Sequence, residues 1–321
     1  MLRFAVSVTL ITRWASQLIS AEDRTVNADH LTHQPPVRRR LLGSALRAYR
    51  ESAGYELSQA ARILDCDRSK VSRIETGQRG ISSGELRELL TEYGVPGDEQ
   101  AALAVIAHHG HDDGWWQGYR DVLSSAGRDL AIMEAAATEI LAFQPQHVPD
   151  LLQTEEYARA LADADPACSG DGQRARVVEA KLARQAVVLG DRAAHLEVVL
   201  AEGAVRQMVG GPQVMRRQLR RLANLGAGDG VAVGDVTVQI LPFGTGAHAL
   251  AGTGAATILR FASMPGLGVV HLDGLAGGAS LEGPDALARY SRAFALLRAA
   301  ALSPADSGEL LRDMAATLPR A

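Results

Sequence analysis

Residues 57–77, LSQAARILDCDRSKVSRIETG, decide the fold of the first part of the chain. On either side of the polar turn Asp65-Cys66-Asp67, small apolar residues recur at helical spacings: Ala61, Leu64, Val71 and Ile74. This pattern predicts two short helices that pack against each other at a steep angle through those positions. The second helix ends at Gly77 and leaves its other face free for contact with a partner.

Further apolar stripes predict helices on both sides of this pair. One stripe precedes the pair and stops at Gly54: Leu42, Ala45, Leu46, Tyr49 and Ala53. Downstream, Ser82 or Ser83 is suited to cap a fourth helix, and a fifth helix spans roughly 98–109. We therefore expect a mainly α N-terminal domain of five helices within residues 38–112.

The charge of the chain is unevenly distributed. The chain has 33 basic and 37 acidic residues, a formal net charge of −4, yet residues 38–80 carry ten basic and five acidic side chains. This segment is therefore at +5 and the remainder at −9, so a polyanionic partner is attracted to this segment alone. The free face of the second helix carries side chains suited to base edges and phosphates in a major groove: Arg68, Ser69, Lys70, Ser72 and Arg73.

Other arginines extend this candidate DNA-binding set. Arg62 and Arg79 flank the second helix. The run Arg38-Arg39-Arg40 allows two interpretations, a flexible arm that reaches the DNA backbone or minor groove, or the solvated start of a helix. Charged residues on a helix face usually do no more than contact solvent. Here the core spacing, the turn and the local positive charge occur in the same segment, and together they favour DNA binding.

Residues 41–93 resemble the xenobiotic-response-element and phage-repressor family of helix-turn-helix regulators. The residues that carry the resemblance are Arg50, Gly54, Ala61, Val71, Glu75 and Gly77. The resemblance implies an ion pair between Arg50 and Glu75 beneath the recognition helix. Two positions depart from the family pattern. Leu57 replaces a polar residue that usually contacts phosphate, and Asp65 replaces the usual turn glycine, which is tolerable because Asp adopts a left-handed backbone more readily than most residues.

Residues 1–37 are expected to form a flexible extension. The apolar run Phe4–Ile11 is interrupted by hydroxyl residues and lacks a clean cleavage site, so it does not fit a signal peptide. It is also far too short to span a membrane. An alternative is that translation begins later, for example at Val26 or Val37.

The two cysteines of the chain are too few for a disulfide scaffold, which favours a reducing cytoplasm.

Residues 113–321 predict an α+β domain with a small sheet. Short β-branched segments bounded by Gly and Pro indicate four strands: His195–Ala201, Val236–Leu241, Ala256–Phe261 and Gly268–Leu272. The stretch Trp115–Ala142 is interpreted as helix with loops. Further helical patterns lie at about 151–162, 174–189, 204–209, 213–225, 285–301 and 306–317. Strands and helices thus occur in mixed order.

Residues 115–318 resemble the uncharacterised sensor-like domain that follows this helix-turn-helix in many actinobacterial regulators. The most specific match is the string 151–158, LLQTEEYA, although Asp150 stands where glycine is usual. The resemblance implies a regulatory role. Genes of this kind often neighbour a small protein, in pairs described as antitoxin-like, so a protein partner is implied. The habit of the family also implies a homodimer.

Several clusters elsewhere allow a functional interpretation. Trp115, Trp116 and Tyr119 are a candidate ligand pocket, with the core of a domain junction as the alternative. The run 108–113 has metal-ligand residue types without metal-ligand spacing, so no metal is expected. Four arginines share one helix face, which is either a surface for an acidic partner or secondary DNA contact, or a solvated one: Arg216, Arg217, Arg220 and Arg221.

No pairing of a nucleophile with a base emerges, and no glycine-rich phosphate loop, so the sequence predicts neither an enzyme nor a cofactor. We expect a sequence-specific, dimeric DNA-binding transcription regulator whose C-terminal domain senses a protein partner or a small ligand. The alternative is an antitoxin-like module that sequesters a small protein partner, with DNA binding for autoregulation.

Overall fold

The computed structural model describes residues 35–107, 114–190, 194–227, 235–261, 267–274 and 278–319. From Pro36 onward the chain forms one compact unit. Residues 1–34 of the expected extension and the run 108–113 lie outside the described residues. Among the helices that are described, none is long and apolar enough to cross a membrane.

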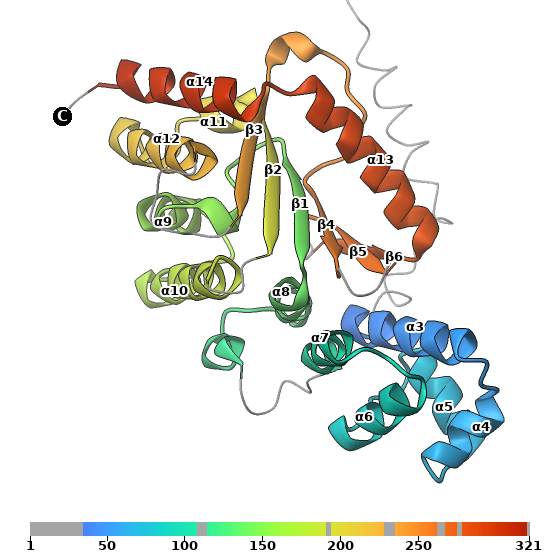
Figure 1. The fold of residues 1–321 in the computed structure, drawn as a ribbon. Coiled ribbons are helices and arrows are strands. Elements are labelled where there is room, and N and C mark those ends of the chain that lie inside the picture. Colours follow the sequence, from blue (N-terminus) through green and yellow to red (C-terminus); the bar gives the residue numbers. More distant parts are fainter. Residues whose placement is uncertain are drawn as a thin grey trace, which may run out of the picture. The chain divides into compact units, whose positions relative to one another are not determined.

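The described residues 37–107 form five helices, as expected (Figure 1). They are α3 (Val37–Ser52), α4 (Leu57–Ile63), α5 (Arg68–Glu75), α6 (Ser83–Glu92) and α7 (Gly97–Ala107). Polar side chains begin two of the short helices: Asp67 caps α5, and Ser82 forms a capping box with Glu85 at α6. These caps satisfy backbone N–H groups that the first helical turn leaves without partners.

Two backbone positions allow α3, α4 and α5 to meet closely. Gly43 of α3 faces the end of α5, where an added Cβ would lie 2.4 Å from the Glu75 carbonyl oxygen. In the turn before α5, Asp65 has a φ of 44°, the left-handed conformation expected at the usual glycine position. The four apolar residues predicted to join α4 and α5 are all buried, so the predicted helix pair is confirmed.

The described residues from 114 onward contain a six-stranded mixed sheet (Figure 1). Its strands are β1 (Glu139–Gln144), β2 (His195–Ala201), β3 (Val236–Leu241), β4 (Ala256–Arg260), β5 (Gly268–Leu272) and β6 (Ala279–Glu282). The order is β3-β2-β1-β4-β5-β6. β1, β2 and β3 are parallel, whereas β4, β5 and β6 are each antiparallel to the preceding strand in that order. The expected α+β class is therefore confirmed.

β1 and β6 are not among the strands predicted from the sequence. The interpretation of Trp115–Ala142 as helix with loops is wrong at its end, because β1 begins at Glu139. β1 is central in the sheet and five of its six residues are buried, so its apolar residues do not alternate with polar ones. β6 is a four-residue edge strand, too short to give a clear signal.

Side chains alternate between the two faces of the sheet and form two separate cores. Ile140 and Ala142 belong to one core, and Leu141 and Phe143 to the other. The first core also contains residues of α9 (Glu155–Ala164), α10 (Asp171–Val188), α12 (Pro212–Ala227) and α14 (Pro304–Thr317), and it continues into the N-terminal helices α3 to α7. α13 (Pro284–Ala300) covers the second core, on the opposite side of the sheet (Figure 1).

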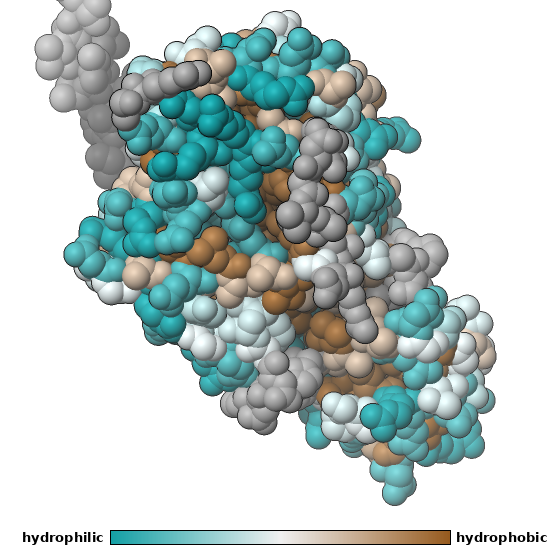
Figure 2. Space-filling model, turned by 60° about the vertical axis from the view of Figure 1, so that its left-hand side comes forward, coloured by the Kyte–Doolittle hydropathy of each residue, from teal (hydrophilic) through white to brown (hydrophobic). Residues whose placement is uncertain are grey.

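α8 (Ser125–Ala136) connects the first five helices to the sheet. It contacts α3 and α7 as well as α10. The remaining short elements are η1 (Trp115–Tyr119), η2 (Asp150–Leu152), α11 (Glu202–Arg206) and η3 (Phe243–Thr245). Hydrophilic residues cover most of the face shown in Figure 2, with hydrophobic residues gathered toward its middle. Most of the buried apolar residues belong to the two cores.

Candidate nucleic-acid interface

α5 has one apolar face and one polar face. Val71 and Ile74 are only 1% and 3% exposed. Four polar residues of the same helix are exposed: Arg68, Ser69, Ser72 and Arg73. The Arg73 guanidinium lies along the helix, and its Nε donates to the Ser69 carbonyl oxygen at 3.2 Å. The structure thus leaves four of the five residues predicted for this face open to a partner.

Lys70, the fifth residue of the predicted face, is partly buried and forms an ion pair with Glu85 of α6. The Glu85 carboxylate also accepts from the Ser82 backbone N–H at 2.9 Å. The hydrogen bonds from Lys70 and from Ser82 lower the pKa of Glu85 to about 2. Lys70 therefore connects α5 to α6. Glu85 is not among the residues predicted from the sequence, although the Ser82-x-x-Glu85 capping box is visible there.

A buried ion pair beneath α5 connects it to α3. Arg50 Nε donates to Glu75 Oε1 at 2.7 Å, and Nη2 donates to Oε2 at 2.9 Å. Arg50 Nη1 donates to the Tyr55 carbonyl oxygen at 2.9 Å. Arg50 is 7% exposed, and its hydrogen bonds with Glu75 raise the pKa of the guanidinium. The ion pair implied by the family resemblance is present.

The three arginines at 38–40 belong to the first turns of α3. Arg38 Nε donates to Asp129 Oδ1 of α8 at 2.9 Å, and Arg40 Nε donates to Glu282 of β6 at 3.0 Å. The flexible-arm interpretation is therefore wrong, because helical backbone and carboxylates of the second part of the chain hold these residues in place. The helix-start interpretation is correct in position, although Arg38 and Arg40 are paired rather than freely solvated.

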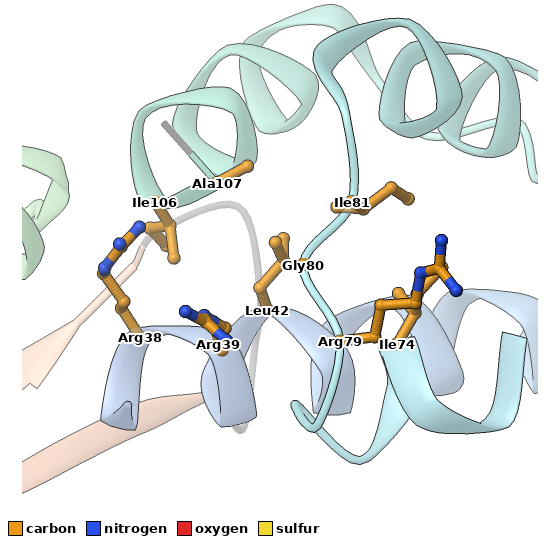
Figure 3. Close-up of a pocket in the computed structure, with 9 residues that line it drawn as sticks. All are labelled: Arg38, Arg39, Leu42, Ile74, Arg79, Gly80, Ile81, Ile106 and Ala107. Carbon is orange, nitrogen blue, oxygen red and sulfur yellow. The ribbon is translucent and has the colours of Figure 1, made fainter. Parts of the chain in front are cut away.

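Two of the remaining predicted arginines border a very small cavity between α3, α7 and the loop after α5 (Figure 3). Arg39 and Arg79 both line it, and its volume of about 10 Å³ accommodates no more than a water molecule. Arg79 and, on α4, Arg62 are exposed. The cavity itself is no ligand site, and Leu42 lies between Arg39 and Arg79 in the view of Figure 3.

The predicted aromatic cluster is packed against α10. Trp115 lies edge-on to Trp116 with 6.2 Å between ring centroids, and its ring lies 5.9 Å from that of Tyr119. The Arg176 guanidinium of α10 lies 4.8 Å from the Tyr119 ring centroid. Trp116 is buried. Ligand binding by these three residues stays a prediction.

The arginine face of α12 is divided among separate contacts. Arg217 Nε lies 3.1 Å from Glu156 Oε1, and Arg221 Nε donates to the Leu152 carbonyl oxygen at 3.2 Å. Arg216 donates to carbonyl oxygens that follow α14. These contacts favour a structural role for this face.

Within the described part of the chain, no three His, Cys, Asp or Glu side chains are grouped to hold a metal ion.

The geometry of α4 and α5, with the buried ion pair below and the polar face above, defines a helix-turn-helix domain, a class that binds DNA. Residues 41–103 match the family described as a helix-turn-helix domain, which supports a DNA-binding regulator. Residues 127–313, more than half of the chain, match the family described as a domain of unknown function (DUF5753). The chain belongs to the DUF5753 family. No curated protein and no solved structure matches it.

Proposed function

We propose that this protein is a sequence-specific transcription regulator of the xenobiotic-response-element type, and that α5 is its recognition helix. The observation that carries the proposal is the exposed polar face of α5 above a core that fixes the helix. Arg68 and Arg73 have the planar guanidinium that contacts guanine in the major groove with two hydrogen bonds. Ser69 and Ser72 supply hydroxyls that either donate or accept. The remaining cationic contacts are to phosphate, from Arg39, Arg62 and Arg79.

Lys70 is assigned a positioning role, because its ammonium already pairs with Glu85. The protein acts as a homodimer in this proposal, since one small module gives limited affinity and specificity. Two recognition helices then meet half-sites about 34–36 Å apart, one turn of the DNA helix. Such a regulator acts in the cytoplasm, where DNA is accessible.

The test is DNA binding by matched arginine variants of the full chain. Binding sites are first selected from a random DNA pool with the wild-type protein. Arg73→Ala should then weaken binding to the selected DNA about tenfold or more in a mobility-shift assay at fixed salt, because a good base contact contributes about 1–3 kcal/mol. Arg292→Ala, an exposed position on α13, is the control and should bind like wild type. Unchanged binding by both Arg68→Ala and Arg73→Ala would show that α5 does not recognise the DNA.

We also infer that the C-terminal domain receives the signal that regulates DNA binding. The support is the position of α8, which carries Asp129 against Arg38 of α3 and Glu134 against Arg184 of α10. A displacement of α8 therefore changes contacts on both sides. The antitoxin-like alternative, with a small protein as the partner, stays a prediction from the family resemblance.

A further inference from the structure

A large cavity opens on the first-core face of the sheet, where β1 ends. Its volume is about 780 Å³, within the range of about 300–1,000 Å³ that is usual for small-molecule sites. Its apolar wall comes from β1 and β2 and includes Ile140, Ala142, Leu196 and Val198. β1 is also the strand at which the sheet changes from parallel to antiparallel pairing. Ligands of open α/β sheets bind beyond the carboxyl ends of strands where the topology changes.

The two cations that line the cavity are already neutralised. Arg184 of α10 donates through Nε and Nη2 to the two carboxylate oxygens of Glu134, each at 2.5 Å. Lys181 Nζ lies 3.0 Å from Asp150 Oδ1. Burial raises the pKa of Asp150, but Lys181 and Arg184 outweigh this effect and hold the pKa below its ordinary value. An anionic ligand would have to displace one of these carboxylates.

At the β1 end, the cavity instead presents hydrogen-bond acceptors. Gln144 is only 5% exposed, and its Nε2 donates to Asp273 Oδ2 at 3.2 Å. Its Oε1 has no hydrogen-bond partner among the described residues. The opposite amide orientation would set the amide oxygen against the carboxylate, so the bond to Asp273 fixes Oε1 as the atom without a partner. A buried acceptor without a partner is costly unless a ligand or water supplies a donor.

The Asp273 carboxylate is the second acceptor. Its Oδ1 lies 3.4 Å from Nε2 of His271, and its side chain is 45% exposed. Burial raises the pKa of Asp273, but hydrogen bonds from His271 and Gln144 outweigh it, so the pKa lies below its ordinary value. Asp273 is therefore ionised at neutral pH and available to a cation.

The charges around the cavity favour the same kind of ligand. Four carboxylates line it, from Glu134, Asp150, Asp165 and Asp273, against the two cations of Lys181 and Arg184. Histidines apart, the lining carries an excess of two negative charges. Charge complementarity therefore favours a cationic ligand and opposes an anionic one.

We propose that this cavity binds a small organic cation, a primary ammonium on an apolar body. The ammonium group donates to the Asp273 carboxylate and to Gln144 Oε1, and the apolar body lies against the β1 and β2 side chains. The role of this ligand as the signal that regulates DNA binding rests on the proposed function. The binding itself can be measured without DNA, so its failure is distinguishable from a failure of DNA recognition.

The test uses three probes with one carbon skeleton: 4-phenylbutylamine, 4-phenylbutanoate and 4-phenylbutanol. Each is titrated calorimetrically into the full chain at neutral pH. The amine should bind at least about tenfold more tightly than the other two, the difference expected for one additional charged contact. Tighter or equal binding of the carboxylate or the alcohol overturns the proposal, and so does the absence of binding by all three at millimolar concentration.

Matched variants place the amine in this cavity. Asp273→Asn should weaken amine binding about tenfold while leaving the circular dichroism spectrum unchanged, because the side chain is partly exposed. Gln144→Leu should weaken it as well, as a second probe of the same end of the cavity. Asp313→Asn, an exposed position on α14, is the control and should bind like wild type. Equal binding by the Asp273 and Asp313 variants would overturn the assignment.

Discussion

Substitution of Glu75 by alanine should destabilise the helix-turn-helix domain strongly. Glu75→Ala removes the carboxylate that accepts two hydrogen bonds from Arg50 and leaves the guanidinium at a position where it is 7% exposed. The described acceptors that remain are the Tyr55 carbonyl oxygen at 2.9 Å and the Glu51 carboxylate, which lies 3.4 Å from Arg50 Nη2. The variant therefore keeps a charged group largely out of water with most of its compensation lost.

Removal of one partner from a buried ion pair costs about 3–5 kcal/mol. Because Tyr55 and Glu51 still compensate part of the Arg50 charge, we expect the lower end of this range, about 3 kcal/mol. This corresponds to a change of about a hundredfold in the opening equilibrium. The double variant Arg50→Met, Glu75→Leu removes both charges and replaces them with apolar volume. It should therefore recover to within about 1 kcal/mol of wild type.

The assay is hydrogen exchange in the full chain, followed in peptides from α3 and α5, because it reports the local free energy of opening. Arg47→Gln is the control. It removes an exposed ion pair with Glu51 and should change the opening free energy by less than about 0.5 kcal/mol. A loss below about 1 kcal/mol in Glu75→Ala, or no recovery in the double variant, would refute the argument from charge burial.

Two further substitutions test the contacts of α5. Gly43→Ala should destabilise the domain by about 1–3 kcal/mol, because the new Cβ would lie 2.4 Å from a backbone oxygen of α5, whereas Ser44→Ala on the exposed side of α3 should not. Urea unfolding measures both, and a stabilised Gly43→Ala would contradict the close approach. Glu85→Gln should lower stability by about 1 kcal/mol at pH 7, since solvent screening reduces the larger effect that the pKa shift alone suggests. The pKa of Glu85 is about 2 against an ordinary 4.5, so the contribution is present above pH 4.5 and is lost as the pH falls toward 2. A stability difference from wild type that persists at pH 2 would contradict the pairing with Lys70.

The local features of the helix-turn-helix pair are predictable because apolar spacing, caps and turn preferences act between residues that are close in the sequence. Helix spacing identifies Val71 and Ile74 as core and leaves Arg68 and Arg73 outside. The left-handed turn at Asp65 follows from the family resemblance, which has glycine at this position, and Asp tolerates that backbone conformation. The Arg50–Glu75 ion pair comes from the family resemblance, not from helix spacing.

Other features depend on residues that are distant in the sequence. In the sequence, Arg38 and Arg40 have the pattern of a basic arm. In the structure they pair with Asp129 and Glu282, which are distant in the sequence. β1 is buried on both faces because one hydrophobic core packs on each side of the sheet, and this burial removes the alternation that would identify a strand.

The sequence by itself determined the helices, the turn and the basic face of the first domain, because periodicity, caps and turn preferences act between neighbours along the chain. Only the tertiary structure decided that Lys70 is paired and that Gln144 and Asp273 meet in one cavity. The physical reason is that burial and electrostatic pairing depend on distances in space. The pairing and the electrostatic environment of each of these side chains follow from the neighbours that the fold places around it and from how far it is removed from water.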